Sequence, residues 1–195
     1  MCWNCAKTVS GRFCGHCKAL QPPVDEYFEF FDLPRNLALD AKDLEKRFYA
    51  LSRQLHPDLY SRKEPREREY SLEATAILND AYRALRDPIA RAQYLLKLEG
   101  FDIGEQTTKD VPPELLEEVF ELNMALEEDA RPELEAARRK FEGMRGEIDA
   151  DVEQKFLDWD AARNRETLAA IRGLLNRRKY ITNLIAKTNH VPDRV

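Results

Sequence analysis

The sequence predicts an all-α protein in three parts: an N-terminal tetracysteine metal knuckle, a helical hairpin and a C-terminal three-helix bundle. Three observations support this fold class. All four cysteines lie at the very start of the chain, apolar residues then recur every three or four positions, and only 7 of 195 residues are glycine. That recurrence places apolar side chains on one face of a helix. Scarce glycine with few valines and threonines argues against a large sheet.

Composition excludes several classes of protein. The chain is 43% hydrophobic and 34% charged, as expected for a folded domain in water. Its net charge of −5 gives no reason to expect nucleic acid as a partner. No apolar run approaches the roughly 18–20 residues that span a bilayer, so no membrane association is expected. The N-terminus does not look like a secretory signal, which favours the bacterial cytoplasm, or the mitochondrial matrix if a transit peptide has been removed.

The cysteines have the spacing of a metal site. The pattern is C-x2-C, eight residues, C-x2-C, formed by Cys2, Cys5, Cys14 and Cys17. Each pair can form a tight knuckle that directs two sulfurs at one centre, and two knuckles complete a tetrahedral set of four. Glycines at positions 11 and 15 are expected to ease the second knuckle. A segment this short cannot bury a core, so we expect a structural zinc ion to order it.

Three other interpretations of the cysteines stay open. Iron could occupy the same four-sulfur site. Residues 14–18, CGHCK, match the active-site string of protein disulfide isomerases, but that chemistry requires a thioredoxin-like setting that the flanking sequence does not indicate. Paired disulfides are disfavoured in a reducing compartment. His16 is expected to be a knuckle residue and not a further ligand.

A short linker, LQPP at residues 20–23, is predicted between the cysteines and the helical hairpin. The hairpin itself is indicated by two apolar stripes. The first contains Leu44, Phe48, Leu51 and Leu55, and the second contains Ala74, Leu78, Ala81 and Leu85. Between them, at the shared end of the two helices, the chain reads His56-Pro57-Asp58.

This segment resembles a J-domain, the module that stimulates ATP hydrolysis by Hsp70 chaperones. The resemblance covers residues 26–99 and includes YFEFFDLP at 27–34, LNDAYRALRDP at 78–88 and RAQY at 91–94. It implies that His56, Pro57 and Asp58 are required for stimulation. It also implies that a basic second helix meets an acidic Hsp70 surface, here through Lys46, Arg47 and Arg53. The alternative for these cations is an ordinary solvated surface.

Three further helical stripes follow a break at residues 100–113 and predict the bundle. The first of these helices has a second apolar row, Leu116, Phe120 and Met124, bordered by Glu117, Glu121 and Glu128. One interpretation is a wide core stripe or a contact with the preceding hairpin. The other is an exposed apolar patch with an acidic rim, which is typical of a partner site.

A J-domain followed by a small bundle resembles the HscB family, the J-proteins dedicated to iron–sulfur cluster assembly, of which a subset has an N-terminal tetracysteine domain. Matching strings are RDPIARAQYLL at 86–96, GFD at 100–102 and LEE at 116–118. The resemblance implies a co-chaperone that joins an HscA-type Hsp70 to an IscU-type scaffold protein. The scaffold-binding residues that it implies are Leu116, Glu117, Phe120, Glu121, Met124, Glu128 and Tyr180. Glu117 stands where the family usually has an apolar residue, and Met124 where it has an acid.

We therefore expect three domains: a zinc-binding domain at 1–21, a J-domain at 22–101 and a scaffold-binding domain at 110–190. No catalytic residues are expected, because the chain has no nucleophile–base arrangement and no glycine-rich phosphate loop. The sequence leaves two other functions open. One is a J-protein for a different client, and the other is a zinc-dependent redox or nucleic-acid-binding protein.

Overall fold

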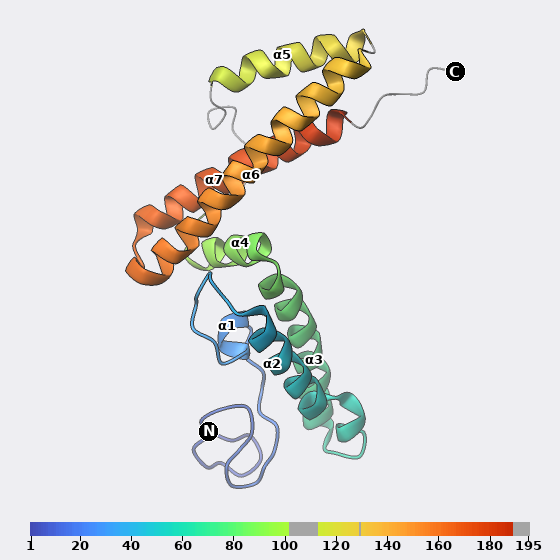
Figure 1. The fold of residues 1–195 in the computed structure, drawn as a ribbon. Coiled ribbons are helices and arrows are strands. Elements are labelled where there is room, and N and C mark those ends of the chain that lie inside the picture. The colour runs from blue at the N-terminus through green and yellow to red at the C-terminus, as the bar shows by residue number, and fades with distance from the viewer. Residues whose placement is uncertain (102–112, 129, 189–195) are drawn as a thin grey trace, which may run out of the picture. The chain divides into compact units, whose positions relative to one another are not determined.

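The computed structural model describes residues 1–101, 113–128 and 130–188 of the chain (Figure 1). The predicted all-α class is confirmed, because the only β pairing among the described residues is an isolated bridge between Phe13 and Leu20. The chain divides into two compact units, residues 1–94 and 95–195, and each is described by itself. No helix in the described ranges is long and apolar enough to cross a membrane.

The first unit is built on two paired helices. After the short α1 (Tyr27–Phe30) come α2 (Ala41–Leu55), the 3-10 turn η1 (Pro57–Tyr60) and α3 (Pro65–Arg86) (Figure 1). The side chains of Glu26 and Asp40 accept the first backbone N–H groups of α1 and α2, which explains where these helices begin. Both predicted stripes face the core, with Leu44, Leu51, Leu55, Ala74, Leu78, Ala81 and Leu85 buried.

The division between the units falls within α4 (Pro88–Leu98). This helix begins at a proline, as is common at a first helical position, and the Asp87 carboxylate accepts the Ala90 N–H at 2.7 Å. Arg91 on α4 is buried in the first unit. Its guanidinium donates to the carbonyl oxygen of Leu37 at 2.9 Å and to that of Leu85 at 2.5 Å. Arg91 therefore joins the loop at Leu37 to the last turn of α3.

The prediction of a linker at residues 20–23 is wrong for Leu20 and Gln21. Leu20 is fully buried, its N–H donates to the Glu67 carboxylate at 3.0 Å, and its carbonyl accepts the Trp3 indole N–H at 2.7 Å. Gln21 is buried as well, and its N–H donates to the Arg12 carbonyl. The two prolines that follow do suit a stiff connection. The sequence could not show that Leu20 closes the cysteine segment and packs it on α3.

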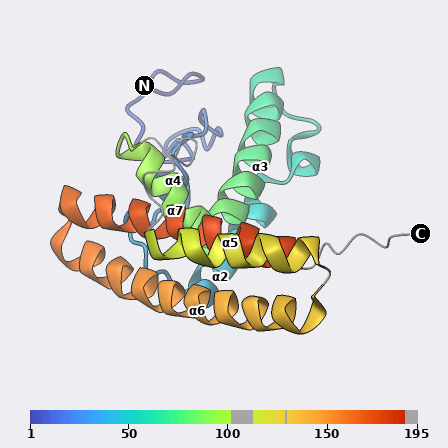
Figure 2. The same ribbon diagram turned by 90° about the horizontal axis from the view of Figure 1, so that it is seen from above.

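The second unit contains α5 (Pro113–Glu127), α6 (Arg131–Ala162) and α7 (Arg165–Thr188). The long helices α6 and α7 lie side by side, and α5 packs mainly on α6 (Figures 1 and 2). α6 ends where Arg163 adopts a left-handed conformation, and the Asn164 side chain then accepts the Thr167 N–H of α7. The predicted stripes form the core, which includes Leu115, Leu122, Phe141, Ile148, Val152, Phe156, Trp159, Ile171, Ile181 and Ile185. Most of the predicted break at 100–113 lies outside the described residues.

Arg91→Ala should destabilise the first unit by about 3 kcal/mol, because it removes a charged donor from two buried carbonyl oxygens. The chain has two tryptophans, Trp3 in the first unit and Trp159 in the second. In a Trp159→Phe background, urea unfolding followed by Trp3 fluorescence therefore reports on the first unit. Arg83→Ala, at an exposed arginine of α3, is the control and should change stability by less than about 0.5 kcal/mol. Equal effects of both substitutions would contradict this role for Arg91.

Candidate functional sites

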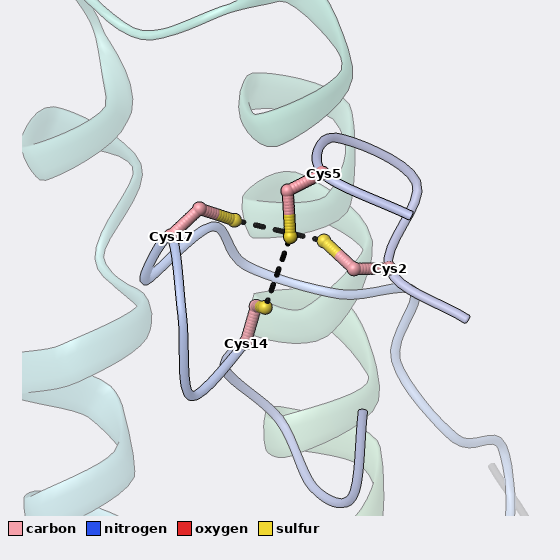
Figure 3. A group of neighbouring side chains, drawn as sticks. All are labelled: Cys2, Cys5, Cys14 and Cys17. Atoms are coloured by element: carbon pink, nitrogen blue, oxygen red, sulfur yellow. Dashed lines mark hydrogen bonds between the residues drawn. The ribbon is translucent and has the colours of Figure 1, made fainter. Parts of the chain in front are cut away.

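The four cysteines converge on one point, as their spacing predicts (Figure 3). Their sulfur atoms all lie within 4.8 Å of one another, and none forms a disulfide. The Sγ–Sγ distance is 3.6 Å between Cys2 and Cys17 and 3.7 Å between Cys5 and Cys14. A zinc ion with Zn–S bonds of about 2.3 Å would place tetrahedral sulfurs about 3.8 Å apart. These four residues therefore fit a tetrahedral metal ion.

Two knuckles of the same backbone design present the sulfurs. In the first, the Cys2 N–H donates to the Lys7 carbonyl and the Ala6 N–H donates to the Cys2 carbonyl. In the second, the Cys14 N–H donates to the Ala19 carbonyl and the Lys18 N–H donates to the Cys14 carbonyl. The residue after each second cysteine, Ala6 or Lys18, has a φ near +60°. The left-handed positions are thus Ala6 and Lys18, together with Gly11, and not Gly15 as the sequence suggested.

The thiols differ in acidity. Burial raises the pKa of Cys2. Hydrogen bonds from the backbone N–H groups of Cys5 and Asn4 and from the neighbouring thiols outweigh burial and lower this pKa to about 6. The backbone N–H of Cys17 is the main cause of a lowered pKa at Cys14. At Cys5 the Lys7 N–H lowers the pKa, but burial and the other three thiols outweigh it and raise the pKa to about 12. Four adjacent sulfurs do not all ionise unaided, whereas a divalent cation stabilises every thiolate together.

The His-Pro-Asp segment forms a turn and not an open loop. Pro57 begins the 3-10 turn η1, and the Nδ1 atom of His56 accepts the Asp58 N–H at 3.3 Å. Because Nδ1 is an acceptor here, the neutral imidazole carries its proton on Nε2. The side chains of His56 and Asp58 are 55% and 89% exposed. The turn therefore presents a donor nitrogen and a carboxylate to solvent.

Polar bonds from α3 hold this turn in place. The hydroxyls of Ser71 and Thr75 both donate to the carbonyl oxygen of Leu55, the residue before His56, at 2.7 and 3.2 Å. Tyr60, at the end of η1, is buried and its hydroxyl donates to the Gln54 carbonyl at 3.0 Å. The last turn of α2 and both ends of the His-Pro-Asp segment are thus fixed by buried side chains.

The predicted basic residues of α2 differ in their surroundings. Lys46 and Arg53 are exposed, and their spacing of seven places them on one face of the helix. Arg47 is half-buried, and its guanidinium donates to the Asp43 carboxylate and to the carbonyls of Phe31 and Asp32. Sequence reasoning missed Tyr49, which is 54% exposed between Lys46 and Arg53. Tyr49 lies three residues after Lys46 and four before Arg53, and this helical spacing could have placed it on the same face.

On α5 the second apolar row is exposed to solvent. Leu116, Phe120 and Met124 are 61%, 65% and 46% exposed, and Glu117, Glu121 and Glu128 beside them are exposed too. This outcome excludes the wide core stripe. Met124, Glu121 and Glu128 also line an open groove of about 490 Å³ between α5 and α6.

The remaining predicted contact, Tyr180, is half-buried on α7 and not on the helix that bears the row. The opposite wall of the groove, which includes Glu133 and Lys140 of α6, was not foreseen from sequence. Lys140 pairs with Glu118 across it, so the unpaired charge along this groove is acidic. The assignment of these residues to a scaffold stays a prediction.

Comparison with known proteins identifies the family. Residues 111–189 match the family described as the HSCB C-terminal oligomerisation domain. The iron-sulfur cluster co-chaperone protein HscB of Mus musculus is 32% identical over 95% of this chain and 80% of its own length. A co-chaperone protein HscB homolog from Shewanella loihica is 30% identical over 86% of this chain and 97% of its own length.

Solved structures agree with these sequence relatives. The crystal structure of human co-chaperone protein HscB has a TM-score of 0.71 at 30% identity and covers 96% of both chains. Chaperone HscB from Vibrio cholerae has a TM-score of 0.60 at 29% identity, covering 87% of this chain and 98% of the other. Together with the four-cysteine centre, these similarities show that the chain belongs to the HscB family of iron–sulfur cluster co-chaperones.

Proposed function

We propose that this protein stimulates the ATPase of an HscA-type Hsp70 and delivers an IscU-type scaffold to it for cluster assembly and transfer. The observation that carries this proposal is the exposed His-Pro-Asp turn, held by buried bonds from α3. The chain itself does not hydrolyse ATP in this proposal. The predicted division into residues 1–21, 22–101 and 110–190 gives each partner and the metal its own region.

The Hsp70 side is the His-Pro-Asp turn with the exposed cations of α2. Asp58 can accept a charge-assisted hydrogen bond from an arginine, and the Nε2–H of His56 can donate to a carbonyl or carboxylate. Lys46 and Arg53 supply positive charge on one face of α2. Such rim charges steer an acidic partner and raise the association rate. Arg47 contributes less to binding, since its guanidinium already bonds within the chain.

The scaffold side is the exposed row on α5 with its acidic border. An exposed aromatic ring among apolar neighbours, with charges at the edge, has the composition of a binding hot spot. Phe120 is the largest side chain of the row and should bury the most area on contact. The glutamates favour a partner surface that offers lysine or arginine beside an apolar depression.

The cysteine centre, in this proposal, holds a structural zinc ion with iron as the alternative. Sulfur fills all four positions, so the ion orders the segment and leaves no open site for chemistry. Cys2, Cys5, Cys14 and Cys17 would be its ligands. Four free thiols also suit a reducing compartment, either the bacterial cytoplasm or the mitochondrial matrix.

His56→Gln should abolish stimulation of a cognate Hsp70 in a steady-state ATPase assay, because glutamine cannot reproduce the imidazole geometry at the turn. The fold should persist, since the His56 side chain is exposed. His16→Gln makes the same substitution at another exposed histidine and should stimulate like wild type. Full stimulation by the His56 variant would refute the proposed Hsp70 contact.

Phe120→Ala should weaken scaffold binding about 30-fold by calorimetry, the effect of losing a hot-spot ring worth about 2 kcal/mol. The free energy of unfolding should change by less than about 0.5 kcal/mol because the ring is exposed. Leu157→Ala removes a similarly exposed apolar residue from α6 and serves as the control. If the two variants bind scaffold equally well, the α5 row is not the contact surface.

Elemental analysis of the purified protein should find about one zinc per chain. Cys14→Ser should lose most of it, since a hydroxyl is a poor ligand beside three thiolates. His16→Gln should keep it, because His16 is exposed and not part of the four-sulfur group. Iron in place of zinc would correct the identity of the ion. Metal retained in full by Cys14→Ser would rule out the tetracysteine site.

A further inference from the structure

We propose that the metal-bound cysteine segment braces the His-Pro-Asp turn through Glu67, a positioning residue at the start of α3, so that metal occupancy governs Hsp70 stimulation. This inference rests on two parts of the proposed function: that the cysteines bind a metal ion and that the turn contacts Hsp70. It is argued from contacts within the first unit that lead from the cysteines to the start of α3, and from α3 to the residue before His56.

Leu20 and Trp3 make the first contact with α3. The Leu20 N–H donates to the Glu67 carboxylate at 3.0 Å, and both residues are buried. The Trp3 indole N–H donates to the Leu20 carbonyl, so Leu20 is held from both sides. The Trp3 ring also lies edge-on to Tyr70 at 6.2 Å and beneath the Arg66 guanidinium at 5.9 Å. The cysteine segment, residues 1–21, therefore contacts Arg66, Glu67 and Tyr70 in the first two turns of α3.

No side chain caps the start of α3, and its third residue bonds to the cysteine segment instead. Glu64, at the N-cap of α3, makes no side-chain capping bond. Glu67 is three residues further on, the position from which a glutamate commonly bonds back to the cap residue. Here it accepts a hydrogen bond from Leu20 instead. Its carboxylate still benefits from the positive end of the helix dipole. The start of α3 thus depends on a residue 47 positions earlier in the chain.

Helix α3, which begins beside Glu67, packs on η1 and so connects this residue to the turn. Tyr60, which ends η1, is buried, and its pKa is raised by burial and by the nearby negative charge of Glu67. One helical turn after Glu67, on the same face, Ser71 donates to the Leu55 carbonyl just before His56. Displacing Glu67 therefore disturbs both ends of the His-Pro-Asp segment.

Metal occupancy enters because the knuckles position both Leu20 and Trp3. Trp3 lies between the ligands Cys2 and Cys5. Leu20 follows the second knuckle, where the Cys14 N–H bonds to the Ala19 carbonyl and Phe13 bridges to Leu20. A segment with so little core depends on its metal for order. Losing the metal should free Leu20 and Trp3 together, and with them Glu67.

The test is hydrogen exchange by mass spectrometry on the full chain, zinc-loaded and after chelation, with metal content measured in parallel. Chelation should raise exchange about tenfold in residues 57–71, as expected when a local brace is lost, and leave residues 131–162 unchanged. Glu67→Ala should keep its zinc, show the raised exchange already when loaded, and stimulate the Hsp70 ATPase several-fold less than wild type. Chelation should then add little.

Two variants separate positioning from general damage. Glu67→Gln keeps an oxygen that can accept the Leu20 N–H, so it should restore most of the protection and stimulation. Glu69→Ala changes an exposed glutamate of the same helix and should behave as wild type. The brace is disproved if chelation leaves exchange in residues 57–71 unaltered, or if Glu67→Ala still gains protection from zinc. A chain that binds no metal overturns the brace together with the proposed zinc site, whereas metal binding without the exchange effect overturns the brace alone.

Discussion

The carbonyl oxygen of Leu55 is the atom on which the geometry of the first unit depends. It ends α2, it precedes His56, and it accepts hydroxyl hydrogen bonds from both Ser71 and Thr75 of α3. A carbonyl at the end of a helix normally bonds to water or to a capping residue. Here α3 satisfies it inside the core, so the direction in which the chain leaves α2 is fixed. The backbone therefore sets the positions of the exposed imidazole and carboxylate of the turn before any partner binds.

Two differently charged surfaces follow from this architecture. In the first unit, α2 presents Lys46 and Arg53 on one exposed face of the helix that leads to the turn. In the second, α5 has glutamates and no lysine or arginine, around an exposed apolar row. In the function proposed above, opposite charge would help each surface to reject the partner of the other, because like charges brought together cost several kcal/mol. A net charge of −5 hides this division, which appears only when the charges are assigned to helices.

Local patterns predicted much of the fold and the sites. Helical spacing located the buried stripes, and the cysteine spacing located the four-sulfur centre. An exposed row at Leu116, Phe120 and Met124 was one of two interpretations of the second apolar row. Contacts between distant residues were not predictable in this way. The bond from Leu20 to Glu67 joins residues 47 positions apart, and neither residue type indicates it.

The burial of Arg47 and the backbone conformation of the knuckles were also not predictable from local sequence patterns. Arg47 resembles its exposed neighbours in sequence, yet carbonyl groups beyond α1 draw its guanidinium inward. The left-handed conformation falls on Ala6 and Lys18, since the backbone bonds of each knuckle require it one residue after the second cysteine. The sequence pointed to Gly11 and Gly15, of which only Gly11 has a positive φ, because the backbone bonds of the folded knuckle decide which residue adopts it.

We propose that one chain couples Hsp70 hydrolysis to a scaffold bound on its second unit. The most direct measurement is the steady-state ATPase rate of a cognate Hsp70 at a fixed concentration of this protein, while the scaffold is titrated in. We expect the rate with both proteins to exceed what their separate effects would give, and to saturate as scaffold occupies the α5 row. A rate that stays at the value for the protein alone at every scaffold concentration would contradict this coupling.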